Sequence, residues 1–112
     1  MLSDRSRHAL IHIRDNIRLA KQFIGAASLD EFRQDVQKFY AVTRCLEIIS
    51  EASRRLDEAT RKRHADVPWN EIMGAGNVYR HGYDGIVEER VWLTVQENLD
   101  ALLAAVEAEL AQ

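Results

Sequence analysis

The chain has few of the residues that interrupt helices or cross-link folds. Its 112 residues include one proline, five glycines and one cysteine. So little proline and glycine leaves room for long helices and little room for a many-stranded β fold. The lone Cys45 rules out a disulfide framework within the chain, which favours an intracellular, cytoplasmic setting.

Long apolar runs and an excess of positive charge are also lacking. The longest apolar run, residues 101–106, is far too short to span a bilayer. The charged N-terminus has no apolar segment of the kind that signal peptides carry. The net charge is -3, whereas nucleic-acid-binding domains are usually basic over a whole face. Any contact with a polyanion is therefore expected to be local.

What is present indicates an ordinary folded protein. The chain is 46% hydrophobic and 29% charged, and 112 residues suit one domain over residues 1–112. Folding at this size buries roughly two-thirds of the unfolded surface, which gives a modest core.

Hydrophobic periodicity predicts helices throughout. Apolar residues at three- and four-residue spacing predict a first helix over about 4–25. Ser28 and Glu31 form a capping box that starts a second, long helix reaching about residue 60. A short third helix is expected from Pro68 to about Arg80, and a last helix carries the apolar residues from Val91 to Leu110. The sequence thus predicts an all-α, up-and-down bundle of four to five helices, four of them main helices.

The densest polar chemistry lies between the third and last helices. Residues 76–83 include Asn77, Arg80, His81 and Tyr83, and Gly82 is placed to cap the third helix. Gly85 helps to form the loop that follows. A histidine can exchange protons near neutral pH, and a guanidinium can bind phosphate oxygens with two parallel hydrogen bonds. This segment is the candidate functional site.

From residue 8 to residue 110 the chain resembles the HepT-like branch of the HEPN superfamily. The resemblance rests on the run at 44–52, on the proline and tryptophan at 68–69, on the 76–83 segment and on Trp92 and Leu99. It implies a dimeric helical bundle that acts as a metal-independent ribonuclease toxin. It also implies a partner, a small nucleotidyltransferase-type antitoxin.

The family motif reads Arg-Asn-x-x-x-His-x-Tyr. Asn77, His81 and Tyr83 match it, but position 76 is glycine where the motif has arginine. The resemblance implies that His81 is the acid and base, that Asn77 orients the reacting groups, and that the partner transfers AMP to Tyr83. Arg80 lies one helical turn after Gly76, so it is the candidate replacement for the phosphate-binding arginine. No cofactor is required and no metal-ligand spacing is evident.

Three functions remain open from the sequence. The first is an endoribonuclease. The second is a catalytically inactive subunit that binds a nucleotidyltransferase, because the motif arginine is replaced by Gly76. The third is a nucleotide-binding module around Arg80, Asn77 and Tyr83, which the absence of a glycine-rich phosphate loop disfavours.

Other polar groups have simpler structural interpretations. Gly74 and Gly76 favour a close helix crossing, with close approach of a phosphate as the alternative. Arg44, Glu47 and Glu51 share a helix face as a salt-bridged stripe that could face the active cleft. Solvated faces are expected for His8 with His12 and for the basic stretch, whose alternative is contact with an RNA backbone. That stretch comprises Arg54, Arg55, Arg61, Lys62, Arg63 and His64. Trp69, Trp92 and Cys45 are expected to be buried.

Overall fold

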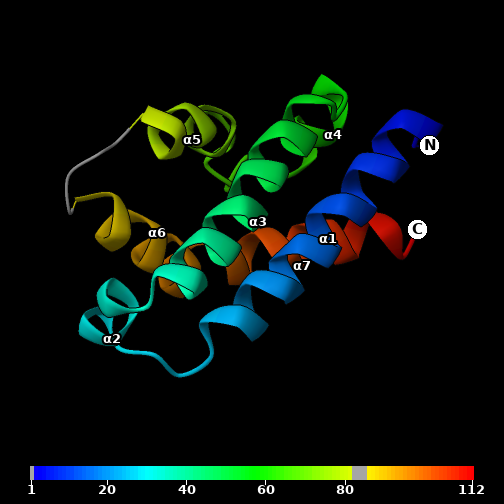
Figure 1. The fold of residues 1–112 in the computed structure, drawn as a ribbon. Coiled ribbons are helices and arrows are strands. Elements are labelled where there is room, and N and C mark those ends of the chain that lie inside the picture. Colours follow the sequence, from blue (N-terminus) through cyan, green and yellow to red (C-terminus); the bar gives the residue numbers. More distant parts are fainter. Residues whose placement is uncertain (1, 82–85) are drawn as a thin grey trace.

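The protein is described from a computed structural model that covers residues 2–81 and 86–112, with the backbone alone for residues 77–81 and 86. All of its regular structure in these ranges is helical, which confirms the predicted fold class. Figure 1 shows the helices, whose bounds are α1 Asp4–Ile24, α2 Leu29–Gln34, α3 Val36–Arg54, α4 Glu58–Arg63, α5 Trp69–His81, α6 Ile86–Glu97 and α7 Leu99–Leu110.

The helices form an elongated body measuring 44 × 25 × 21 Å. In Figure 1, α1 and α3 run antiparallel in front of α7, and α5 lies across the far side of α3 from α1. The two ends of the described chain lie at the same end of the body (Figure 1). This arrangement leaves one side of α3 covered by α1 and places α5 beside another.

One core joins the helices. The side chains of Ile13, Ile17, Phe32, Val42 and Val91 are fully buried, and they come from α1, α2, α3 and α6. Burial of this apolar surface is the main favourable contribution to folding, at about 25 cal/mol per Å². Within the described residues, no helix is both long and apolar enough to cross a membrane.

The predicted helix starts are confirmed where side chains cap them. The Ser3 hydroxyl accepts a hydrogen bond from the Ser6 amide at 3.0 Å and starts α1. The predicted capping box is present, because the Glu31 amide donates to Ser28 Oγ at 3.1 Å and the Ser28 amide donates to Glu31 Oε1 at 2.9 Å. Pro68 directly precedes α5 instead of lying in its first turn.

The prediction of one long helix from Ser28 to about residue 60 is wrong. The chain breaks at Asp35, whose carboxylate accepts from the Lys38 amide at 3.0 Å and so starts a new helix, α3. A side chain that caps its own backbone competes with continuous helix, and the uninterrupted apolar stripe concealed this. α3 ends at Arg54, and α4 follows as a separate short helix.

The last helix is likewise divided, at Asn98, into α6 and α7. The Asn98 amide still donates to the Thr94 carbonyl, and the Leu102 amide to the Asn98 carbonyl, so the backbone bonds continue through the break. The third helix was predicted over 68–80 and is observed as α5, Trp69–His81. The predicted roles of Gly82 and Gly85 lie outside the described residues.

Candidate functional site

The predicted site residues lie at the C-terminal end of α5. The backbone of Asn77, Arg80 and His81 is helical, so Asn77 and His81 are one turn apart on the same face. Arg80 follows Gly76 by one turn, as the replacement hypothesis requires. The side chains of these three residues lie outside the described part of the structure, as does the whole of Tyr83.

Gly76 is buried where α5 meets α3. Its amide donates to Ser50 Oγ at 3.3 Å, and the Ser50 hydroxyl donates in turn to the Met73 carbonyl at 2.9 Å. Arg54 Nε donates to the same carbonyl at 2.9 Å. Two α3 side chains therefore hold the turn of α5 that immediately precedes the motif. The close helix crossing expected from the glycines is found at Gly76.

Gly74 has a different environment. A Cβ added at Gly74 would meet no atom within 4 Å, so this glycine faces open space. Close approach between helices therefore does not explain the glycine at position 74.

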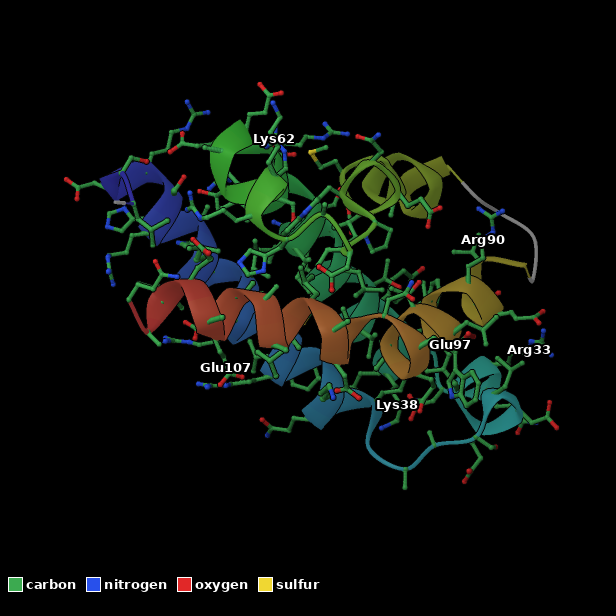
Figure 2. The ribbon with its side chains drawn as sticks, turned by 180° about the vertical axis from the view of Figure 1, so that it is seen from behind. Arg33, Lys38, Lys62, Arg90, Glu97 and Glu107 are labelled. Carbon is green, nitrogen blue, oxygen red and sulfur yellow. The ribbon has the colours of Figure 1, made fainter. Side chains whose placement is uncertain are left out.

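Gly74 borders a groove between α5 and α6 with a volume of about 570 Å³. Its polar lining includes two carboxylates, Glu71 and Glu97, and one guanidinium, Arg90. Figure 2 shows Arg90 projecting from α6 on the side where α5 lies. The groove runs along α5, the helix that carries the motif. The lining of the groove carries charges of both signs.

A second hollow of about 330 Å³ is lined, among the described residues, by α3 and by Arg55, which directly follows it. It brings together the predicted stripe of Arg44, Glu47 and Glu51, with Ile48 and Arg55. The expected salt bridges within the stripe are not found, because neither Arg44 nor Glu51 forms an ion pair with any other described residue. Arg44 and Glu51 therefore carry charges that no other described residue neutralises.

The basic stretch makes contacts within the chain, although Arg54, Arg55, Lys62 and Arg63 are exposed. Arg61 Nη1 donates to the Leu56 carbonyl at 2.5 Å, and Lys62 pairs with Glu58 at 3.3 Å. Arg63 Nη2 donates to Glu109 Oε1 at 2.7 Å. The exposure of these four side chains confirms the expected solvated face, and the contacts of Arg61, Lys62 and Arg63 leave them less available to an RNA backbone.

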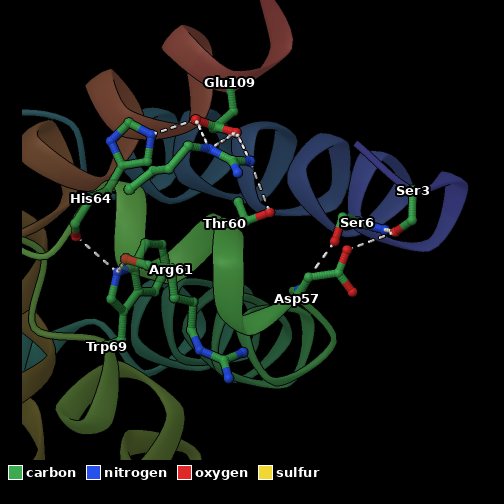
Figure 3. Close-up of polar contacts among 9 residues, drawn as sticks. Ser3, Ser6, Asp57, Thr60, Arg61, His64, Trp69 and Glu109 are labelled. Atoms are coloured by element: carbon green, nitrogen blue, oxygen red, sulfur yellow. Dashed lines mark hydrogen bonds and ion pairs between the residues drawn. The ribbon is translucent and has the colours of Figure 1, made fainter. Parts of the chain in front are cut away.

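Glu109 is the centre of those contacts and is only 2% exposed. Besides Arg63, His64 Nε2 lies 2.7 Å from Glu109 Oε2 (Figure 3). The Arg63 hydrogen bonds lower the pKa of the Glu109 carboxyl, desolvation opposes this, and the His64 contact lowers it further. This cluster ties α7 to α4.

The remaining predictions have simple outcomes. Cys45 is buried, as expected, and desolvation raises the pKa of its thiol. Trp69 is buried, and its indole donates to the carbonyls of Arg61 and His64 at 3.1 and 2.9 Å. Trp92 is half-buried and donates to the Ala27 carbonyl at 2.9 Å. His8 and His12 are exposed, and no group of three metal-ligating residues occurs in the described ranges.

Sequence reasoning missed Ser50, whose hydroxyl bonds to both Met73 and Gly76 of the motif helix. A hydroxyl within an apolar stretch was the available signal, since a buried hydroxyl requires a partner.

Comparison with known proteins gives the chain its family. A family model described as Ribonuclease HepT-like matches residues 13–109. A Thermococcus cleftensis protein named "Probable ribonuclease HepT" is 31% identical over 90 residues, which cover 80% of this chain and 82% of the relative. A Methanocaldococcus jannaschii protein, provisionally named an RNase, is 36% identical over 86 residues, or 77% and 79% of the two chains. A similarly named protein of Caldanaerobacter subterraneus is 31% identical over 96 residues, 86% of each chain.

No solved structure matches the chain. The sequence matches and the all-helical fold point to one class of protein, the ribonucleases. The chain belongs to the HepT-like ribonuclease family. Membership supports ribonuclease activity with RNA as the substrate.

Proposed function

We propose that this protein is the toxin of a cytoplasmic toxin–antitoxin pair and a homodimeric, metal-independent endoribonuclease. The observation that carries the proposal is the retention of Asn77, His81 and Tyr83 in a chain that matches the family over residues 13–109. The placement of Asn77 and His81 one turn apart on α5 supports it.

The proposed reaction needs no cofactor. His81 takes the proton of a ribose 2′-hydroxyl, whose oxygen attacks the adjacent phosphorus. The bond to the 5′-oxygen breaks, and that oxygen takes a proton from a protonated group in the site or from water. The products are a 2′,3′-cyclic phosphate and a free 5′-hydroxyl. The Arg80 guanidinium binds the phosphate as negative charge develops, and the Asn77 amide orients it.

RNA cleavage in the presence of a metal chelator tests this activity. We expect cyclic phosphate ends with the wild type, and a rate at least about 10²-fold lower with His81→Ala or Arg80→Ala. Arg18→Ala is the matched control, because Arg18 is an exposed arginine on α1. Intact RNA with the purified wild type, and no difference from His81→Ala, would contradict the proposal.

The burial of Gly76 favours a second candidate, an inactive subunit that binds a nucleotidyltransferase. Position 76 has no side chain to bind phosphate, and its amide is already bonded to Ser50. Gly76→Arg distinguishes the two candidates, provided that circular dichroism and unfolding curves show that the variant folds. Toxicity that appears only in this variant favours the inactive subunit, whereas toxicity of the wild type favours the nuclease.

Regulation by the partner is the last part of the proposal. We propose that the small nucleotidyltransferase-type antitoxin transfers AMP to the Tyr83 hydroxyl from ATP, releasing pyrophosphate. The reaction is tested by mass spectrometry after incubation with ATP and the partner. A gain of one AMP group in the wild type and none in Tyr83→Phe is the expected result, and modification of Tyr83→Phe to the same extent would exclude this site.

A further inference from the structure

Arg54, the last residue of α3, contacts the helix that carries the motif. Its Nε donates to the Met73 carbonyl at 2.9 Å, and the hydroxyl of Ser50, one turn earlier on α3, donates to the same oxygen. In an α-helix the carbonyl of residue 73 also accepts from the amide of residue 77. The backbone of α5 is helical through Asn77, so the Arg54 guanidinium lies beside the backbone of the first matched residue of the motif.

No other described residue neutralises the charge of Arg54. Its single hydrogen bond uses Nε, so Nη1 and Nη2 donate to no described group, and the side chain forms no ion pair with a described carboxylate. Arg33 and Arg63, by contrast, pair with Glu89 and Glu109. Arg54 is also exposed. It therefore keeps hydrogen-bond donors and a positive charge for an anion from outside the chain.

Gly76 shows why a cation from α3 is useful at this place. Gly76 is buried and its amide is bonded to Ser50, so the position offers a phosphate neither a side chain nor a free donor. The same serine bonds to the Met73 carbonyl that Arg54 contacts, so Arg54 and Gly76 lie around one hydroxyl. The bond through Nε already restrains the guanidinium, which reduces the side-chain entropy lost on binding. The planar fork of the guanidinium fits two oxygens of one phosphate.

We propose that Nη1 and Nη2 of Arg54 bind a phosphate of the RNA backbone beside Asn77. Arg54 then supplies, from α3, a cation that position 76 on α5 lacks, and it acts together with Arg80. Contact with an RNA backbone is thus assigned to the first residue of the basic stretch. The proposal rests on the ribonuclease function proposed above and adds a phosphate-binding residue to it.

The salt dependence of RNA binding tests this contact. Fluorescence anisotropy measures the affinity for single-stranded RNA over a range of salt concentrations, with His81→Ala as the parent so that the RNA stays intact. Adding Arg54→Gln should weaken binding about tenfold, since a charge-assisted hydrogen bond is lost. It should also make the slope of log affinity against log salt concentration shallower by about 0.7, the contribution of one phosphate contact on a single strand. Adding Arg54→Lys should keep the slope, because the charge is retained.

Arg55→Gln is the matched control. Arg55 is the neighbouring exposed arginine, and its side chain makes no hydrogen bond or ion pair with a described residue. Its replacement removes the same charge and should leave the affinity and the slope unchanged. A purely structural role for Arg54 would give a different pattern, because loss of the bond to Met73 would lower the free energy of unfolding and leave the salt slope as it was.

Chemical modification gives a second measurement that needs no variant at position 54. Phenylglyoxal reacts with exposed guanidinium groups, and mass spectrometry of peptides reports the reaction of each arginine. Bound RNA should slow the modification of Arg54 in the His81→Ala protein and leave that of Arg55 unchanged. Circular dichroism and urea unfolding check the fold of each variant, and the modification decides the matter if Arg54→Gln does not fold.

Three results would overturn the Arg54 site: a parent protein that binds no RNA, an unchanged slope in folded Arg54→Gln, or modification of Arg54 at the same rate with and without RNA. Because binding is measured without cleavage, these outcomes separate from the activity. Cleavage by the wild type together with an unchanged slope would exclude the Arg54 contact and leave the nuclease. A shallower slope together with a wild type that leaves RNA intact would keep the contact and contradict the nuclease.

Discussion

At the scale of single residues, Ser50 joins α3 to the helix that carries the candidate site. Its hydroxyl accepts from the Gly76 amide and donates to the Met73 carbonyl. We expect Ser50→Ala to lower the free energy of unfolding by about 1–3 kcal/mol, since it removes both bonds between the helices. Urea unfolding monitored by circular dichroism measures the change.

Ser53→Ala is the matched control for Ser50. Ser53 is buried on the same helix, but its hydroxyl donates only to the Ile49 carbonyl of its own helix, at 2.8 Å. Its replacement should cost less than that of Ser50 because α3 and α5 keep their contact. Equal losses for the two variants would show that Ser50 does not hold α5.

The Glu109 carboxylate gives a prediction about pH. The Arg63 hydrogen bonds hold its folded-state pKa below the ordinary value, so the unfolded chain binds a proton more readily. The carboxylate thus contributes stability at pH values above its unfolded pKa of about 4.3, and this contribution is lost as pH falls through the lower folded pKa. Glu109→Gln should unfold more easily at pH 7 and lose less of its stability than the wild type between pH 5 and pH 3.

Unfolding curves at a series of pH values test this assignment, with Glu107→Gln as the control. Glu107 is an exposed glutamate on the same helix. If Glu109→Gln and the wild type lose stability in parallel on acidification, the buried contact between Glu109 and Arg63 is not the cause of the pH dependence of stability.

At the scale of elements, replacing two glycines by alanine is predicted to change the stability of the protein in opposite directions. Gly25 ends α1 with φ at +54°, a region that side chains with a Cβ rarely adopt, whereas Gly74 lies within α5 and faces open space. Gly25→Ala should therefore destabilise the protein by about 1 kcal/mol, and Gly74→Ala should stabilise it by about 0.5–1 kcal/mol. Thermal unfolding of both variants checks the signs, and a shift of the same sign in both would contradict the assignment.

How far the sequence predicts these elements depends on whether a signal is local. The start of α1, the capping box at Ser28 and the extent of α5 within one or two residues follow from caps and periodicity. The break at Asp35 was missed because the apolar stripe runs through it. The helices on its two sides bury the same face, and the ring centroids of Phe32 and Phe39 lie 5.9 Å apart in an edge-to-face arrangement. The contact between Ser50 and Gly76 spans 26 residues, and no local pattern encodes it.

The candidate site shows the same limit. Motif spacing identifies Asn77 and His81 and indicates that Arg80 follows position 76 by one turn, and the helical backbone of α5 agrees. The positions of Arg44 and Glu51 on one face also follow from spacing. Their lack of ion pairs could not be predicted, because helical spacing permits a salt bridge without requiring one.

At the scale of the whole molecule, charge limits how RNA is bound. The net charge is -3, and Arg61, Lys62 and Arg63 already contact other groups in the chain. The most basic stretch of the chain is therefore partly engaged within the molecule, and we expect recognition to depend on a small number of phosphate contacts near the end of α5.

This gives a prediction about salt. The logarithm of the affinity for single-stranded RNA should fall with the logarithm of salt concentration with a slope of about -1 to -2, because each phosphate contact contributes roughly -0.7. Fluorescence anisotropy with His81→Ala, which binds without cleaving, measures the slope. Adding Arg80→Ala should make it shallower by about 0.7, whereas adding Arg63→Ala should leave it unchanged, since Arg63 is engaged by Glu109. A slope steeper than about -5 would mean that a broad basic surface binds the RNA, and an unchanged slope in the Arg80 variant would remove that residue from the phosphate site.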